Sequence, residues 1–488
     1  MSEPTRFVSR GQVMVVGPDA PHTMTVLEYL RLRLRRTGSK EGCAEGDCGA
    51  CTVVIGELDR DGRLRYRAVN ACILFVHQLD GKALFTVDDL AEPDGGLHPV
   101  QQAMVDAHAS QCGFCTPGFV MSLLAYFLGH DKADDESLKD ALAGNLCRCT
   151  GYRPILEAGH RMFDSGRDDR FAREEAALTI QLKALADGRH RMLRHSTPEG
   201  NFIAPRSSAE LAETLSTLPA GESWLLAGGT DVALWVTKQG RAPRSIVYLG
   251  GITDMKWIEE RAGETEIGAT VTYTDAFDAI ARLHPAFARM VRRLGSTQIR
   301  NSGTLGGNIA NGSPIGDSMP ALIALGATLK LQSKAGMRTM PLEDFFLSYR
   351  KTALKPGEFV ASVTVKKPGP QSRVGIYKLS KRFDQDISAV LAAFHVMLDG
   401  NVVKEARLAY GGMAGIPARA RQAEAALVGK AFTPEAIEPA AAAMAADFTP
   451  MSDMRASAAY RLLAAQNLLR KFCVEVNTGK PIGVEAAE

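Results

Sequence analysis

Eight of the nine cysteines lie in the first third of the 488-residue chain, and their spacing is typical of metal ligands. Cys43, Cys48 and Cys51 form a C-x4-C-x2-C loop, and Cys72 follows after a gap of twenty residues. This is the plant-type spacing of four thiolates around a [2Fe–2S] cluster. Three glycines within the loop allow it to curl tightly and bring backbone N–H groups near the sulfurs. A zinc site is the alternative, although zinc usually binds two C-x2-C-like pairs.

A second set of four cysteines follows in a helical region. Cys112 and Cys115 form a C-x2-C pair, and Cys147 and Cys149 form a C-x-C pair. We expect Thr116 to be the N-cap of a helix, so that the Cys115 thiolate faces the helix N-terminus, which stabilises negative charge. By spacing alone, zinc or a catalytic C-x2-C pair remains an alternative. Beside a ferredoxin-type loop, a second iron–sulfur cluster is favoured, and two clusters indicate the stepwise transfer of single electrons.

Two glycine-rich segments offer a different chemistry. Residues 225–232 are an apolar strand that leads into Gly-Gly-Thr-Asp, and a second glycine-rich segment covers 303–316. Backbone N–H groups exposed at such turns can bind a pyrophosphate. Neither segment is a G-x-G-x-x-G fingerprint or a P-loop, so tight turns without a ligand are the alternative. The ninth cysteine, Cys473, is expected to be a packed helical residue.

Composition excludes several classes of protein. The formal net charge of +2 excludes a polybasic nucleic-acid coat and an acidic disordered chain. No secretory signal or membrane span is evident, so we expect a cytoplasmic protein with neither nucleic-acid nor membrane partners. In that compartment, clustered cysteines are more often metal ligands than disulfides.

The pattern of elements predicts a multidomain α+β chain. Residues 1–88 contain short strands with turn signals and one helix at 25–36. Four short helices follow, beginning near Pro99, Thr116, Asp134 and Pro154. A segment dense in charge at 166–196 is expected to be a linker, partly helical. Strands and helices then mix, and alanine-rich helices complete the chain.

The motifs at 40–51, 111–118 and 144–155 resemble the molybdenum hydroxylase family, specifically xanthine dehydrogenases. The resemblance covers nearly the whole chain and implies five regions. They are a β-grasp ferredoxin domain (1–88), a four-helix [2Fe–2S] bundle (89–165), the linker (166–196), an FAD-binding domain of the CO-dehydrogenase-flavoprotein type (197–370) and a C-terminal flavoprotein domain (371–480). By this resemblance each cysteine set holds one [2Fe–2S] cluster, and Gln111 lies beside the molybdopterin of the neighbouring module.

The same resemblance implies an FAD site along the two glycine-rich loops. Asp317 would contact FAD through ribose hydroxyls, and residues 349–352 match the segment near the flavin edge, where nicotinamide approaches. The implied FAD contacts are Leu225, Leu226, Ala227, Gly228, Gly229, Thr230, Asp231, Val232, Leu294, Thr304, Leu305, Gly306, Gly307, Asn308, Asp317, Val360 and Lys378.

The chain has no room for a molybdopterin domain, so we expect the electron-transfer subunit of a two-chain enzyme. Its partner would be a large molybdopterin-binding subunit, in a heterotetramer of two small and two large chains. The partner would oxidise hypoxanthine and xanthine to urate, and electrons would pass through both clusters to FAD and then to NAD⁺ rather than O₂. No side chain of this chain is expected to be catalytic.

The sequence leaves three alternatives open. The chain could serve a related aldehyde or aromatic-substrate molybdenum hydroxylase, although clusters and flavin on one chain argue against carbon monoxide dehydrogenase. It could be a stand-alone flavin and iron–sulfur carrier, or an interaction module held together by zinc.

Overall fold

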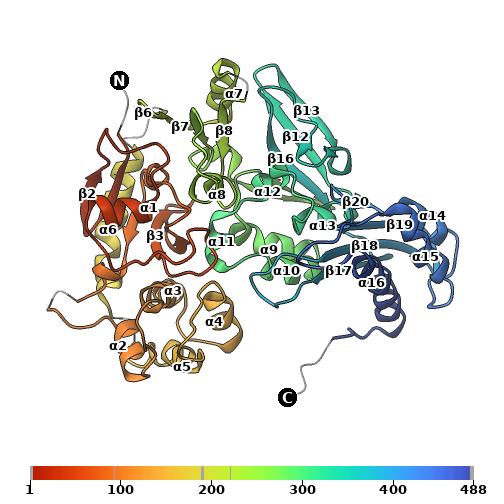
Figure 1. The fold of residues 1–488 in the computed structure, drawn as a ribbon, viewed down its shortest axis with the longest axis horizontal. Coiled ribbons are helices and arrows are strands. Elements are labelled where there is room, and N and C mark those ends of the chain that lie inside the picture. Colours follow the sequence, from red (N-terminus) through yellow and green to blue (C-terminus); the bar gives the residue numbers. More distant parts are fainter. Residues whose placement is uncertain (1–3, 93, 167, 188–191, 220, 484–488) are drawn as a thin grey trace. The chain divides into compact units, whose positions relative to one another are not determined.

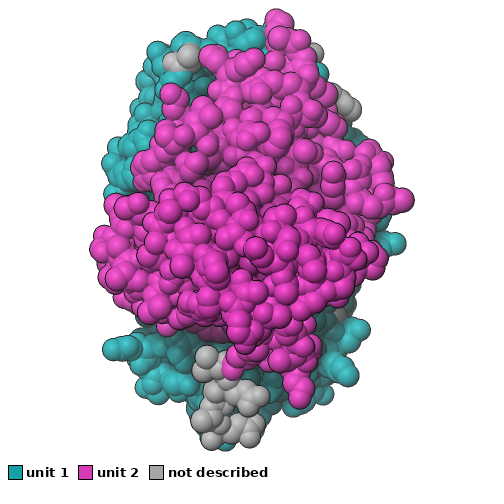
Figure 2. All heavy atoms as spheres, turned by 90° about the vertical axis from the view of Figure 1, so that its right-hand side faces the viewer, with its two compact units in different colours: residues 1–253, 295–303 teal, residues 254–294, 304–488 magenta. Residues whose placement is uncertain are grey.

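The computed structural model describes residues 4–92, 94–166, 168–187, 192–219 and 221–483. The chain divides into two compact units, which Figure 2 distinguishes by colour. Unit 1 comprises residues 1–253 and 295–303, and unit 2 comprises 254–294 and 304–488. The segment 197–370, expected to be one flavin domain, therefore contributes to both units. Among the described residues, no helix is long and apolar enough to cross a membrane.

Unit 1 begins with a mixed five-stranded sheet in the order β2-β1-β5-β3-β4. Strand β1 runs parallel to β5, and the other neighbours are antiparallel. This arrangement is the β-grasp fold that the family resemblance implied. The strands are β1 (Arg6–Ser9), β2 (Gln12–Val15), β3 (Thr52–Leu58), β4 (Leu64–Asn70) and β5 (Ala83–Phe85).

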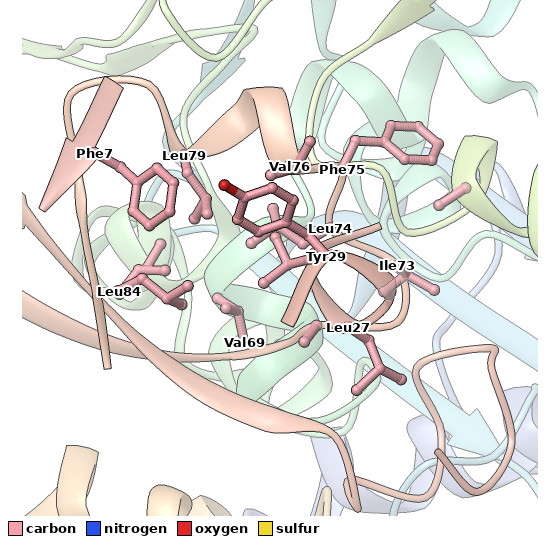
Figure 3. Close-up of a cluster of buried hydrophobic side chains, with 14 of the residues drawn as sticks. Phe7, Leu27, Tyr29, Val69, Ile73, Leu74, Phe75, Val76, Leu79 and Leu84 are labelled. Carbon is pink, nitrogen blue, oxygen red and sulfur yellow. The ribbon is translucent and has the colours of Figure 1, made fainter. Parts of the chain in front are cut away.

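The sheet separates two apolar cores because side chains alternate along its strands. Val53 and Ile55 of β3 join one core, while Val54 between them joins the core of the helical region that follows. In the first core, the rings of Phe7 and Tyr29 meet edge to face, with centroids 6.2 Å apart. Figure 3 shows the Tyr29 ring among the surrounding aliphatic side chains.

The helix predicted at 25–36 is shorter in the structure. It consists of α1 (Val26–Glu28) and a π-helical turn, Tyr29–Arg33. A capping box fixes its start, since the Thr25 hydroxyl accepts from the Glu28 N–H and the Glu28 carboxylate accepts from the Thr25 N–H. Two 3₁₀ turns complete this region, Val76–Leu79 and Val87–Asp89.

All four predicted short helices are present. Asp134 caps the third helix by accepting from two backbone N–H groups, as expected. The second helix differs in one residue, because Cys115 occupies the N-cap position and Thr116 is the first helical residue. The prediction that Thr116 is the cap was therefore wrong. The helices are α2 (Pro99–Asp106), α3 (Thr116–Gly129), α4 (Asp135–Leu142) and α5 (Arg153–Arg161).

The expected linker contains an ordered helix, α6 (Arg170–Asp187), drawn beside the first sheet in Figure 1. Leu178 and Leu182 pack against Val8 of β1 and Ala83 of β5. The sequence did not predict that this helix packs on the sheet. The segment is dense in charge, and its apolar side chains occupy only one narrow face. Of the expected linker, residues 167 and 188–191 lie outside the described part of the chain.

Unit 1 also contains a second sheet in the order β6-β7-β9-β8, in which β7, β9 and β8 are parallel neighbours. A short helix from much later in the chain, α11, joins this unit although both of its flanking segments belong to unit 2. The elements are β6 (Leu193–Thr197), β7 (Gly200–Ala204), α7 (Ser208–Thr217), β8 (Ser223–Leu226), α8 (Val232–Thr237), β9 (Ser245–Tyr248) and α11 (Thr297–Ser302).

Unit 2 contains a five-stranded antiparallel sheet, β10-β11-β16-β12-β13, and a short β14–β15 hairpin. Their strands are β10 (Ile258–Arg261), β11 (Glu264–Gly268), β12 (Thr328–Ser333), β13 (Gly336–Pro341), β14 (Phe346–Ser348), β15 (Lys351–Thr352) and β16 (Phe359–Lys366). The accompanying helices are α9 (Tyr273–Leu283), α10 (Pro285–Arg292), α12 (Leu305–Asn311) and α13 (Ser318–Ala324), with a 3₁₀ turn at Leu342–Asp344. A further 3₁₀ turn, Thr253–Met255, spans the boundary between the two units.

The C-terminal part of unit 2 is a four-stranded antiparallel sheet, β17-β18-β19-β20, with three helices. The predicted alanine-rich helices are confirmed as α15 and α16, and Cys473 on α16 is fully buried as expected. The elements are β17 (Ser372–Leu379), β18 (Val390–Asp399), β19 (Val402–Gly411), β20 (Ala418–Arg419), α14 (Arg421–Leu427), α15 (Glu438–Asp447) and α16 (Ala458–Thr478).

The packing of α6 yields a stability prediction. Replacing the fully buried Leu182 by alanine leaves a cavity against the sheet, so the free energy of opening α6 should fall by about 2–5 kcal/mol. Ile180→Ala, on the exposed face of the same helix, should change it by less than about 0.5 kcal/mol. Hydrogen exchange of the α6 amides in the full chain measures both effects, and equal losses would contradict the packing described.

Candidate functional site

The first sheet brings the four cysteines of the first set together. Cys51 immediately precedes β3, and Cys72 follows just after β4. Because β3 and β4 are antiparallel, with Thr52 opposite Asn70, these two cysteines lie at the same end of the pair. Cys43 and Cys48 lie on the loop that leads into β3.

Direct contacts join the thiols of this set. Hydrogen bonds from the Cys48 and Cys72 thiols lower the pKa of Cys43, and the same contacts raise the pKa values of Cys48 and Cys72. Cys72 also bonds the Cys51 thiol. Three backbone N–H groups surround the Cys43 sulfur, from Glu45 at 3.5 Å and from residues 47 and 48 at 3.4 Å each.

The glycines of the loop are required by its geometry, as the sequence indicated. Gly46 and Gly49 adopt φ angles of +77° and +71°, in the left-handed region that favours glycine. A Cβ atom on Gly42 would lie 2.8 Å from the Cys48 sulfur. The backbone therefore approaches the sulfurs more closely than a residue with a side chain would permit.

The second cysteine set gathers at the ends of α3, α4 and α5, and it is more exposed than the first. The free thiol of Cys112 lies next to that of Cys149, and the free thiol of Cys115 lies next to that of Cys147. Burial, followed by the Cys147 thiol, raises the pKa of Cys115 to about 12. The Tyr152 hydroxyl accepts from the Cys147 N–H at 3.0 Å, which fixes the C-x-C loop against the start of α5.

Both sets present the donors that a [2Fe–2S] cluster requires. Each set brings its four thiols to one place, the second as two neighbouring pairs, and a cluster with two irons takes four cysteine ligands. Backbone N–H groups already point at the Cys43 sulfur, where they would stabilise negative charge on the cluster. Within the described residues, no group of three or more His, Cys, Asp or Glu is arranged around a single metal ion.

The two sets are joined by direct backbone contact. The Leu146 N–H, next to Cys147, donates to the Cys48 carbonyl oxygen at 3.0 Å. A Cβ on Gly49 would lie 2.1 Å from the Gly144 carbonyl oxygen, and a Cβ on Gly118 would lie 2.2 Å from the Gly49 carbonyl oxygen. The segments that carry the cysteines of the two sets thus meet at glycines, where no side chain separates the backbones.

The first glycine-rich loop, residues 225–232, connects β8 to α8 at the carboxyl end of a parallel strand, where ligands bind in open α/β sheets. A Cβ on Gly228 would lie 1.9 Å from the Ser302 carbonyl oxygen at the end of α11. Gly229, with φ +82°, lies against Ile73, since its Cβ would be 3.1 Å from the Ile73 carbonyl oxygen. This loop therefore contacts the residue that follows Cys72.

From Thr304 onwards, the second glycine-rich segment lies in unit 2. The Thr304 hydroxyl accepts from the Gly307 N–H at 3.0 Å and caps α12. Asn308 accepts from the hydroxyls of Tyr273 and Ser318, at 3.0 and 2.7 Å. These bonds hold the loop and α12 against the start of α13.

Three of the residues expected to contact FAD in unit 2 lie together. Lys378 and Asp317 form an ion pair at 2.7 Å, with side chains 3% and 8% exposed. The other Asp317 oxygen accepts from the Ser388 hydroxyl, and the Lys378 ammonium also donates to the Arg293 carbonyl oxygen, next to Leu294. Val360 lies apart from this pair, in β16 opposite Leu331.

The segment expected near the flavin edge, residues 349–352, comprises the turn after β14 and the strand β15. Tyr349 is 63% exposed, and Arg350 adopts φ +54°. Gln111, expected beside a molybdopterin, is exposed on the loop that precedes Cys112.

The sequence analysis did not predict several residues that the structure places at the candidate sites. Asn145 and Gln298 are buried polar residues between the cysteine sets, and Ser388 and Arg293 anchor the Asp317–Lys378 pair. Asn145 stands two residues before Cys147, which was a local signal. Gln298 lies 149 residues beyond the last cysteine of the second set and carried no signal at all.

Comparison with known protein families assigns descriptions to four segments. Residues 16–77 match a 2Fe-2S iron-sulfur cluster binding domain, and 86–160 match a [2Fe-2S] binding domain. Residues 197–368 match the FAD binding domain in molybdopterin dehydrogenase, and 375–476 match the CO dehydrogenase flavoprotein C-terminal domain.

Similar proteins include two curated xanthine dehydrogenases. The one from Drosophila subobscura is 34% identical over 463 residues, which are 84% of this chain and 34% of that protein. The one from Emericella nidulans is 33% identical over 499 residues, 91% of this chain and 36% of that protein. The chain thus spans about a third of the length of these curated relatives.

Two solved structures are similar to part of the chain. A chain of carbon monoxide dehydrogenase from Hydrogenophaga pseudoflava, in a form lacking the Mo-pyranopterin moiety of the molybdenum cofactor, is 30% identical with a TM-score of 0.53, over 56% of this chain and 96% of that one. A chain of quinoline 2-oxidoreductase from Pseudomonas putida 86 is 25% identical with a TM-score of 0.53, over 58% and 99%.

The close approach at Gly118 predicts that alanine at this position destabilises the protein, whereas helix propensity alone predicts that it stabilises it. Alanine favours helices over glycine by about 1 kcal/mol, yet Gly118→Ala should destabilise unit 1 by about 1–3 kcal/mol because its Cβ meets the Gly49 carbonyl. Gly129→Ala, in the last turn of the same helix and with nothing within 4 Å, should be neutral or stabilising. Thermal unfolding, with iron content as a second readout, measures both; a neutral Gly118→Ala would contradict the contact.

Proposed function

Because the chain belongs to the molybdenum hydroxylases, as their 2Fe–2S and FAD part, we propose that it transfers electrons from a molybdenum site to FAD through two [2Fe–2S] clusters. The observation that carries this proposal is the direct hydrogen bond between the two cysteine sets, from Leu146 to Cys48. When bound, the clusters supply one-electron steps and the flavin pairs electrons for a two-electron acceptor.

The eight cysteines divide into the two proposed ligand sets. Cys43, Cys48, Cys51 and Cys72 hold the cluster next to the flavin, because the residue after Cys72 touches the loop at 225–232. The second set, Cys112, Cys115, Cys147 and Cys149, holds the cluster through which electrons enter. This chain's own contribution is to hold the thiolates, direct N–H groups at the sulfurs and keep water from the first set.

The proposed FAD contacts lie on elements that each unit orders by itself. In unit 1 they are residues 225–232, whose backbone is fixed by the close approaches of Gly228 and Gly229. In unit 2 they are residues 304–308, Leu294, Val360 and the buried pair Asp317–Lys378. Both Asp317 oxygens already accept hydrogen bonds, so a ribose hydroxyl would use its remaining lone pairs.

The proposed overall reaction is that of an NAD⁺-dependent xanthine dehydrogenase, in which hypoxanthine and xanthine are oxidised to urate away from this chain. Its support is the identity of 30–34% to proteins named xanthine dehydrogenase across 84–91% of the chain. The exposed hairpin at 349–352 is proposed as the place where nicotinamide approaches the flavin.

The proposed partner is a large molybdopterin-binding subunit, in a cytoplasmic heterotetramer of two small and two large chains. The second cysteine set supports this proposal, because Cys112 and Cys149 are exposed and apolar side chains accompany them on the same two loops. Phe114, Leu146 and Tyr152 are 49%, 43% and 40% exposed. Exposed apolar side chains beside a redox site are typical of a surface that a partner covers.

A second candidate function is the same electron transfer in a related hydroxylase of aromatic or aldehyde substrates. The similarity to a chain of quinoline 2-oxidoreductase supports this second candidate function. Steady-state rates of the complex with xanthine, quinoline and an aldehyde would distinguish the two. Turnover of xanthine with O₂ alone would contradict the proposed acceptor, NAD⁺.

The cofactor content tests the proposal directly. The purified chain should contain about four irons, four acid-labile sulfides and one FAD. Cys149→Ser should remove the electron paramagnetic resonance signal of one reduced cluster and leave the other, because the ligand sets are separate. Cys473→Ser, at the buried cysteine outside both sets, should leave both signals unchanged. Zinc in place of iron would contradict the proposed function.

A further inference from the structure

A cluster of buried polar side chains lies between the two cysteine sets, and none of the motifs accounts for it. Thr52, Ser122, Asn145 and Gln298 are each at most 2% exposed. They come from β3, α3, the loop before Cys147 and α11. Burial of four polar groups without a charge is costly unless they bond one another, so their arrangement is specific.

The side chains form a relay that ends on one carbonyl oxygen. Gln298 Nε2 donates to Asn145 Oδ1 at 3.0 Å, and Ser122 Oγ donates to the same oxygen at 2.7 Å. Asn145 Nδ2 in turn donates to the Gly49 carbonyl oxygen at 3.2 Å. Thr52 donates to that oxygen twice, from its hydroxyl at 2.6 Å and from its N–H at 3.0 Å.

The other end of the same peptide group faces a sulfur. The Gly49 carbonyl shares a trans peptide with the Ala50 N–H, so this N–H points away from the relay. Ala50 lies beside the Cys48 sulfur, because that sulfur and the Ala50 Cβ would be 2.8 and 3.7 Å from the same Cβ placed on Gly42. Donors on a carbonyl oxygen draw electron density through the peptide and strengthen its N–H as a donor. Three donors on Gly49 therefore act on Cys48, although none of them touches it.

Resting on the proposed function, we propose that Thr52, Asn145 and Gln298 are positioning residues that raise the reduction potential of the cluster held by the first cysteine set. They act by polarising the peptide between Gly49 and Ala50. Reduction adds one electron to the cluster and moves no proton of the relay. A stronger N–H bond to a ligand sulfur stabilises the added negative charge, so the potential rises.

The position of Gln298 gives the relay a second consequence. Gln298 lies on α11, which enters unit 1 from a segment that matches an FAD binding domain. Arg300 of α11 pairs with Asp140 at 2.7 Å, and Asn301 donates to the Ala68 carbonyl oxygen at 2.9 Å. Docking of α11 therefore completes the relay, and the flavin-binding part of the chain tunes the iron–sulfur part.

Thr52→Val tests the proposal because it keeps the shape of the side chain and deletes the strongest donor. A reductive titration of the intact holoprotein, followed by electron paramagnetic resonance, gives the potential of each cluster. We expect the reduced-to-oxidised ratio of the first cluster to fall about threefold at fixed potential, which is about 28 mV for a one-electron couple. The second cluster should change by less than half as much.

A matched control separates tuning from stability. Thr86 is equally buried in the same domain, and its hydroxyl donates to Asp89, away from both cysteine sets. Thr86→Val should lower the melting temperature but leave both potentials unchanged. An unmoved potential in Thr52→Val, or equal shifts in both clusters, would overturn the proposal.

If Thr52→Val fails to retain iron, a milder variant tests whether the relay raises the potential of the first cluster. Gln298→Leu removes the amide that donates to Asn145, Ser122 and the Thr52 hydroxyl, but it keeps both Thr52 donors to the Gly49 carbonyl oxygen, so a smaller shift of the same sign is expected. No shift, or a positive shift, would overturn the proposal. Absence of iron from the unaltered chain would instead contradict the proposed function, and the inference with it.

Discussion

The close approach of three backbone segments at Gly49, Gly118 and Gly144 is the constraint on which unit 1 depends. Each segment carries ligands of a cysteine set on one or both sides, and a Cβ at Gly49 or Gly118 would fall within 2.2 Å of a carbonyl oxygen. Without side chains, the loops come close enough for the Leu146 N–H to reach the Cys48 carbonyl. The rate of electron transfer falls steeply with distance, so this contact is the structural basis of the proposed function.

Close backbone contact leaves polar groups buried, and the relay through Asn145 joins four of these side chains by hydrogen bonds. An unsatisfied buried donor or acceptor costs about 1–3 kcal/mol, so a relay of four side chains is worth more as a whole than its bonds taken singly. The same bonds orient the peptide that faces Cys48. Stability and redox tuning thus depend on one set of contacts.

In unit 2 the corresponding fixed element is the ion pair of Lys378 and Asp317. Two buried charges are stable only when further hydrogen bonds compensate the loss of water. Ser388 and the Arg293 carbonyl supply those bonds, and they tie β17 to α10 and to the start of α13. The pair therefore holds in place three of the positions proposed to contact FAD.

The sequence by itself determined the parts whose signal is local. Cysteine spacing, the glycines of the first loop and the prolines that begin helices each depend on a few neighbouring residues, and the helices α2–α5 and the two thiol sets follow from them. The β-grasp topology of the first sheet was implied by the family resemblance of these motifs. Only the tertiary structure decided that α6 packs on the sheet, that the segment 197–370 contributes to two units and that Gln298 reaches Asn145. These features join residues up to 246 positions apart, as Gln298 and Thr52 show, and no local pattern records which distant surfaces will exclude water together.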